Sequence, residues 1–101
     1  MMNRDEIRAK LLELCQEDYY GVWELWWAVS QKVETPSSLP ELMNDFIHVI
    51  LRLVEEGKLV AGSGGFPGKP FIHNPLDKQE LLRQIRNSRE PNASFYSFGA
   101  T

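Results

Sequence analysis

One amphipathic segment, residues 39–56, constrains the fold of this chain more than any other feature. When successive residues are placed 100° apart, its apolar side chains form one broad stripe opposite the charged ones. Ser38 and Glu41 form a capping-box pattern at its start. Pro40 is tolerated in a first turn, and Gly57 is typical of a helix C-terminus, so we predict a long helix. Its stripe, which other elements must cover, consists of Leu39, Leu42, Met43, Phe46, Ile47, Ile50, Leu53 and Val54.

Three further helices are predicted around this one. Asn3 begins a capping-box pattern that is followed by apolar residues at helical spacing, which predicts a helix over 4–17. The tryptophan-rich segment predicts a second helix over 22–33, although its aromatic and β-branched content makes helix propensity uninformative. Asn74 as an N-cap predicts a last helix over 75–88.

The residues after Gly57 change from helical to strand character. Segments 58–62 ("KLVAG") and 69–73 ("KPFIH") are predicted to be short strands, joined by a glycine- and proline-rich loop whose glycines allow positive φ. A hairpin of this size must pack on the helices. The predicted fold class is therefore α+β and mainly helical, with a three-helix core, a C-terminal two-stranded hairpin and one further helix.

This order of elements resembles the winged-helix (winged helix-turn-helix) superfamily. The residues that carry the likeness are "GVWELWWAV" and "FIHVILRLVEEGKLVAG", within a matching region of about 4–73. The resemblance implies a single winged-helix-like domain over 1–88, whose hairpin is the wing. The aromatic tail over 89–101 follows it, and the sequence leaves open whether this tail is ordered.

A second resemblance is to small uncharacterised bacterial proteins of the toxin-immunity type. It is carried by the early tryptophan-rich helix, the helix end "LRLVEEGKL" and the aromatic tail. This likeness implies an immunity or inhibitor protein whose partner is a toxin domain.

The composition is that of an ordinary folded domain. The chain has 101 residues, of which 43% are hydrophobic and 25% charged, and it contains no apolar run long enough to cross a membrane. Cys15 is the only cysteine, so no internal disulfide forms, and the first ten residues are charged where a signal peptide needs an apolar core. We therefore expect a cytoplasmic protein.

The net charge of −3 is unevenly distributed along the chain. Residues 1–57 contain five basic and eleven acidic side chains, whereas residues 58–101 contain six basic and three acidic ones. The first part would repel a polyanion, and the second would tolerate one.

The three tryptophans of "VWELWWAV" divide into two kinds. With Val22 at 0°, Trp26 lies near the apolar stripe of its helix, which predicts a core residue, whereas Trp23 and Trp27 lie at about 100° and 140° on its shoulder. Shoulder tryptophans can pack against the last helix or the tail, or they can be exposed anchors for a partner. The sequence leaves this choice open for both.

A protein partner is the first functional hypothesis. Helix 39–56 carries mainly carboxylates on its polar side, and DNA affinity comes from Lys and Arg that neutralise phosphates. A non-catalytic interaction domain, acting as an inhibitor or an adaptor, therefore fits better than a recognition helix, and a homodimer is also left open. The candidate partner-binding residues are Trp23, Trp27, Glu41, Asp45, His48, Arg52 and Glu55.

A winged-helix DNA-binding regulator is the alternative. Its phosphate contacts would come from the wing and from arginines at spacings of three on the last helix. The candidate nucleic-acid-binding residues are Lys58, Lys69, Arg83, Arg86 and Arg89.

The sequence offers little for catalysis or cofactor binding. His48 and His73 are the only histidines and have no metal-ligand spacing, either with each other or with Cys15. The loop "GSGGFPGKP" lacks a phosphate-binding signature, because that motif needs a glycine where Ser63 stands and a hydroxyl residue at Pro70. We expect no enzyme activity, no metal and no cofactor.

Overall fold

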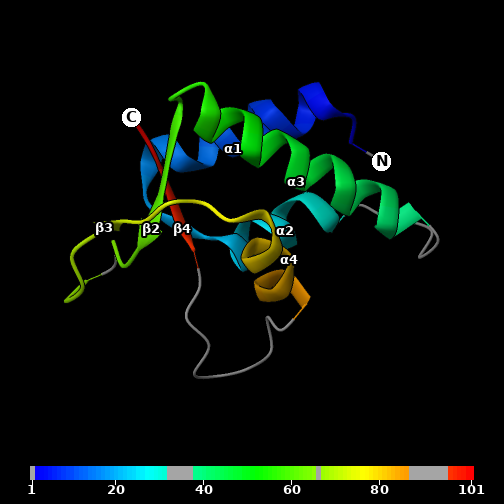
Figure 1. The fold of residues 1–101 in the computed structure, drawn as a ribbon. Coiled ribbons are helices and arrows are strands. Elements are labelled where there is room, and N and C mark those ends of the chain that lie inside the picture. The colour runs from blue at the N-terminus through cyan, green and yellow to red at the C-terminus, as the bar shows by residue number, and fades with distance from the viewer. Residues whose placement is uncertain (1, 32–37, 66, 87–95) are drawn as a thin grey trace.

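A computed structural model describes residues 2–31, 38–65, 67–86 and 96–101. These residues form four helices and one antiparallel four-stranded sheet, which confirms the predicted α+β class (Figure 1). The elements are α1 (Arg4–Glu17), β1 (Tyr20–Gly21), α2 (Val22–Ser30), α3 (Leu39–Glu55), β2 (Leu59–Ser63), β3 (Ile72–His73), α4 (Lys78–Arg86) and β4 (Ser97–Ala100).

The first and third helices form where local signals predict them. The Asn3 side chain accepts the backbone N–H of Glu6, and the Glu6 carboxylate accepts the backbone N–H of Asn3, which is a complete capping box. Gly57 ends α3 with a φ of 74°, a left-handed conformation that favours glycine. The start of α1 and the end of α3 are therefore determined by local residues, whereas the predicted Ser38 capping hydrogen bond is not formed at the start of α3.

The predicted two-stranded hairpin is part of a larger sheet, so that prediction was incomplete. Strands β2 and β3 pair antiparallel, as expected, but the strand order is β1-β4-β2-β3. The sequence predicted no strand within 89–101, yet β4 pairs with β2 on one side and β1 on the other. The ladder partners of Phe98 are Tyr20 and Ala61, which are far from it in the chain. Pairing over such distances leaves no pattern in the neighbouring residues from which β4 could be predicted.

The last helix begins later than predicted. Asn74 does not cap α4, because its backbone N–H donates to the Ala61 carbonyl and its side-chain amide donates to Ser63 Oγ. The Asp77 carboxylate instead accepts the backbone N–H of Gln79. Asn74 therefore bonds to β2 and is not available to cap the helix. Helix α2 ends at Ser30 with Gln31 as its C-cap, and residues 32–33 of its predicted extent lie outside the described residues.

The core lies where the helices meet the sheet. Helix α1 packs against α3 and β4, while α2 and α4 pack against each other and against α3. Val49 is also buried, although it lies outside the predicted stripe, because α3 contacts neighbours on more than one side. The completely buried side chains, which define the core, are those of Ile7, Leu11, Val22, Leu25, Leu42, Phe46, Ile50, Leu53, Leu81 and Phe98.

An aromatic pair covers glycines of the sheet and its loop. The rings of Tyr19 and Phe71 stack with centroids 4.4 Å apart. A Cβ atom at Gly99 or Gly65 would lie 2.5 or 2.6 Å from the Tyr19 ring, and one at Gly62 would lie 2.7 Å from the Phe71 ring. The absence of side chains at these positions is what lets the rings lie against the backbone.

Candidate interaction surface

Helix α2 exposes two large aromatic side chains one turn apart. Val22, Leu25 and Val29 are buried and define its core face. Trp23 and Trp27 point away from that face, and their exposed fractions are 41% and 59%. Both shoulder tryptophans are thus exposed in the described structure, Trp27 more than Trp23.

The third tryptophan has a different role. Trp26 is half-buried and packs against Phe46 of α3, with ring centroids 5.3 Å apart and an angle of 56° between the rings. It therefore joins α2 to α3 at the margin of the core, close to its predicted position. The exposed face of α2 is formed by Trp23 and Trp27, together with the carboxylate of Glu24.

The polar side of α3 is less acidic than its sequence suggests. Arg4 of α1 donates to the Asp45 carboxylate at 2.8 Å, so Asp45 is half-buried and paired. Arg8 of α1 binds both carboxylate oxygens of Glu56, at 2.9 and 3.0 Å. These hydrogen bonds lower the pKa of Glu56 and raise that of Arg8. Two of the carboxylates are therefore neutralised within the molecule.

The remaining partner-binding candidates on α3 are exposed. Glu41 and His48 have no ion pair with any described residue, and Arg52 lies 3.9 Å from the Glu55 carboxylate on the same helix. An exposed pair at this distance contributes little to stability. The α3 surface is mixed in charge, which weakens the electrostatic preference for a protein partner that rested on this helix.

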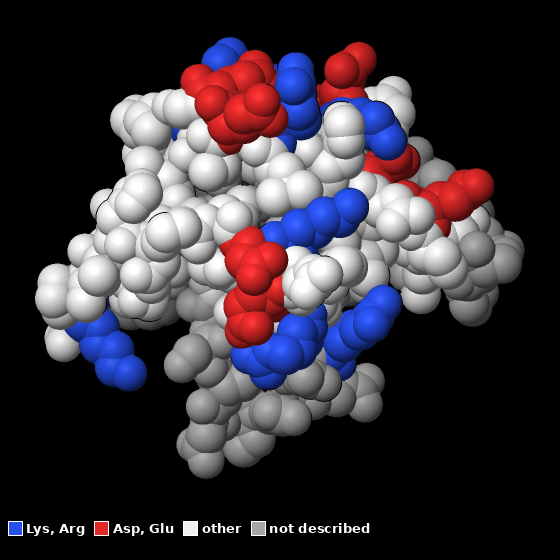
Figure 2. All heavy atoms as spheres, viewed as in Figure 1, with Lys and Arg blue, Asp and Glu red and all other residues white. Residues whose placement is uncertain are grey.

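The nucleic-acid-binding candidates are not gathered into one basic surface in the described part of the chain. Lys58 follows α3, Lys69 precedes β3, and Arg86 lies near the end of α4, all of them exposed. Arg83 donates to the Glu80 carboxylate. On the face in Figure 2, basic side chains alternate with acidic ones. Arg89 lies outside the described residues.

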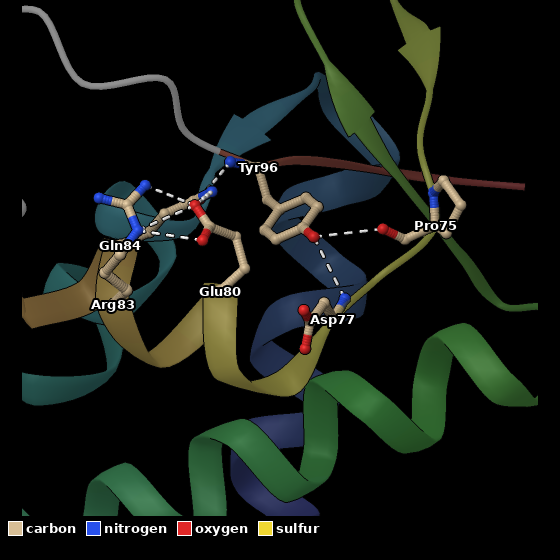
Figure 3. A network of polar contacts seen from close by, with 6 residues as sticks. All are labelled: Pro75, Asp77, Glu80, Arg83, Gln84 and Tyr96. Carbon is tan, nitrogen blue, oxygen red and sulfur yellow. Dashed lines mark hydrogen bonds and ion pairs between the residues drawn. The ribbon is translucent and has the colours of Figure 1, made fainter.

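A polar network that the sequence did not predict joins the start of β4 to α4 (Figure 3). The Tyr96 hydroxyl donates to the Pro75 carbonyl at 3.2 Å and accepts the backbone N–H of Asp77 at 3.1 Å. The buried Gln84 side chain accepts the backbone N–H of Tyr96 and donates to Glu80. Through Tyr96 and Gln84 the network links the residue before β4 to α4 and to the turn that precedes this helix.

Two kinds of reactive group, a metal cluster and an ionised cysteine, can be checked among the described residues. No group of three or more His, Cys, Asp or Glu side chains is placed to hold a metal ion in this part of the chain. Cys15 is buried, and desolvation raises the pKa of its thiol to about 12, so the nucleophilic thiolate is not formed near neutral pH. In the same residues, no helix has the length and apolar character needed to cross a bilayer.

Comparison with protein-family models, curated proteins and solved structures found no match to this chain. The two resemblances drawn from the sequence therefore receive no support from a relative. The exposed face of α2 is therefore the strongest candidate for a binding surface.

Proposed function

We propose that this chain is a non-catalytic domain that binds another protein through Trp23 and Trp27 on α2. The supporting observation is the exposure of two tryptophan side chains on adjacent turns of one helix. Tryptophan is enriched at the energetic centres of protein interfaces, where its ring buries a large apolar area at low entropic cost. Isolated exposed apolar residues are common, but two neighbouring tryptophans make a contiguous patch.

The core face of α2 is formed by other residues. Val22, Leu25 and Val29 supply its core contacts, and Trp26 supplies its contact with α3. Polar residues at positions 23 and 27 would leave the core face of α2 unchanged and would expose less apolar surface to water. The tryptophans are therefore better explained by a partner than by stability.

We further propose that the fold is winged-helix-like. The order α1, α2, α3, β2, β3 supports this assignment, as does the β2–β3 pairing across a loop with positive φ at Gly64 and Gly65. The position of β4 between β1 and β2 is a departure from a simple two-stranded wing.

Capture from the native host tests the proposed function. The tagged wild-type chain is compared with Trp23→Gln/Trp27→Gln, in which glutamine retains helix propensity. The comparison variant is Glu41→Gln/Glu55→Gln, which alters two exposed candidates on α3 that binding through α2 does not involve. We expect the wild type and the comparison variant to retain the same partner, identified by mass spectrometry, and the tryptophan variant to lose it. Circular dichroism and thermal unfolding establish that all three are folded.

Two results would contradict the proposal. One is retention of the same partner by the tryptophan variant. The other is binding of duplex DNA by the wild type that weakens steeply with salt and is lost when Lys58 and Lys69 are replaced, which would favour the DNA-binding alternative.

A further inference from the structure

We infer that the partner presents a positively charged segment, with Arg or Lys side chains, to the exposed face of α2. This inference rests on the proposed function and adds the chemistry of the partner. It depends on Glu24, which follows Trp23 on α2, and on the acidic residues of α1 and its C-cap.

The chain from the end of α1 through α2 carries only negative charge. No Lys or Arg occurs between Lys10 and Lys32, and the four charged residues in this interval are acidic. All four are exposed, and none forms an ion pair with a described residue. By contrast, Asp45 and Glu56 of α3 are neutralised by arginines of α1. The four unpaired residues are Glu13, Glu17, Asp18 and Glu24.

The placement of these carboxylates opposes the stability of α1. Glu13 and Glu17 are four residues apart, so two like charges are neighbours on one helix surface. Glu17 and the C-cap Asp18 lie at the negative end of the helix dipole, where a cation would be stabilising, and the last turn contains no basic residue. A cationic partner would relieve both unfavourable interactions.

The carboxylates and the tryptophans are close along the chain. Asp18 is four residues before Val22, the start of α2, so the Cα atoms of these two residues lie within about 14 Å of each other even for an extended chain. Glu24 directly follows Trp23 on the helix itself. Tryptophan faces also attract cations, most strongly among the aromatic residues. The tryptophan rings and the carboxylates therefore both favour a segment with Arg or Lys side chains.

A second copy of the chain fits this face less well. Two α2 helices packed through their tryptophans would bring two Glu24 carboxylates to the same interface, and α2 has no basic residue to compensate them. Like charges at an interface oppose association. Charge thus selects a cationic partner over self-association.

The test uses a defined probe, a 12-residue peptide that alternates Leu with Arg, and a matched peptide in which neutral citrulline replaces every Arg. Binding is followed by the indole N–H signals of Trp23 and Trp27 in NMR spectra, assigned with single Trp→Phe variants. We expect the Arg peptide to shift both signals and to bind on the order of fivefold more tightly than the citrulline peptide, with an affinity that falls as salt rises.

Two variants that each remove two negative charges show which carboxylates attract the Arg peptide. Asp18→Asn/Glu24→Gln removes two carboxylates beside the tryptophans but keeps side-chain oxygens for the N–H groups of Tyr19 and Gly21. Glu41→Gln/Glu55→Gln removes two from α3. We expect the first variant to bind the Arg peptide on the order of fivefold more weakly and the second to bind it like the wild type.

Three outcomes would overturn the inference. Equal binding of the two peptides would mean that charge does not select the partner, while the proposed docking of a protein on Trp23 and Trp27 would stand. An equal effect of the two charge variants would mean that attraction is general to the molecule. Concentration-dependent dimerisation in sedimentation experiments, abolished by Trp23→Gln/Trp27→Gln, would make a second copy the occupant.

Discussion

Tyr96 shows how one side chain can join segments that are distant in the chain. Its ring is buried and lies 6.3 Å from that of Phe98, while its hydroxyl reaches the turn before α4. The hydroxyl satisfies a backbone N–H near the start of that helix, which has no intrahelical acceptor of its own. A residue from the predicted tail thus helps to define where α4 begins.

Replacing Tyr96 with phenylalanine isolates the contribution of this hydroxyl. The ring stays, while the Pro75 carbonyl and the Asp77 N–H lose their partner. We expect the free energy of unfolding to fall by about 1 kcal/mol, the usual value for one lost hydrogen bond. Urea unfolding with an unchanged m-value measures it. Tyr20→Phe serves as the control, because no hydrogen bond joins its hydroxyl to a residue that the structure describes. An equal loss there would rule out a specific role for Tyr96.

At the scale of elements, glycines of the sheet and its loop make room for a stacked aromatic pair. Tyr19 lies between α1 and β1 and stacks on Phe71, just before β3, so the pair links the two edges of the sheet. Its ring lies against Gly99 of the inner strand β4. The packing of Tyr19 and Phe71 against β4 therefore depends on the absence of a side chain at Gly99.

Gly99→Ala tests this packing. The added Cβ would lie 2.5 Å from the Tyr19 ring, so the ring must move and the stack with Phe71 must change. We expect a loss of about 1–3 kcal/mol in unfolding free energy, the usual cost of overpacking. The double variant Gly99→Ala/Tyr19→Ala removes the clash and is expected to lose less than the sum of the single variants. Additive losses would show that the contact does not limit stability.

At the scale of the whole molecule, ion pairs connect α1 with α3 and lie within α4. Arg4 and Arg8 pair with carboxylates 41 and 48 residues away, so these contacts form only when the helices dock. The Arg83 and Gln84 side chains lower the pKa of Glu80 to about 2. Because these groups are partly exposed to solvent, each pair contributes modestly to stability.

These lowered pKa values predict acid sensitivity. A carboxyl whose pKa is lower in the folded state stabilises the fold above its unfolded pKa and loses that contribution as pH falls through the folded value. For Glu80 the interval runs from the ordinary 4.5 down to about 2, and Glu56 shifts in the same direction. We expect the melting temperature to fall across this interval.

The variant Glu80→Gln checks the source of this sensitivity. It cannot titrate, so its melting temperature is expected to fall less steeply between pH 4.5 and 2 than that of the wild type. Glu41→Gln, which removes an exposed carboxylate without an ion pair to a described residue, is the control. Identical slopes for Glu80→Gln and the wild type would mean that Glu80 does not contribute.

The sequence by itself determined the features that depend on neighbouring residues. The bounds of α1 and most of α3 followed from apolar periodicity, from the Asn3 capping box and from Gly57. These signals are local because a helix bonds residues four apart. The pairing of β2 with β3 could also be predicted, because the two strands follow each other in the chain and are joined by one loop. Together these elements give the class α+β.

Only the tertiary structure decided the rest. The place of β4 in the sheet depends on partners about 40 and 80 residues away, Ala61 and Tyr20, which no local pattern encodes. The pairing of Asp45 and Glu56 with α1 likewise depends on how two helices dock. The exposure of Trp23 and Trp27 could not be predicted either, because a residue on the shoulder of a helix is buried or exposed according to which neighbour covers it.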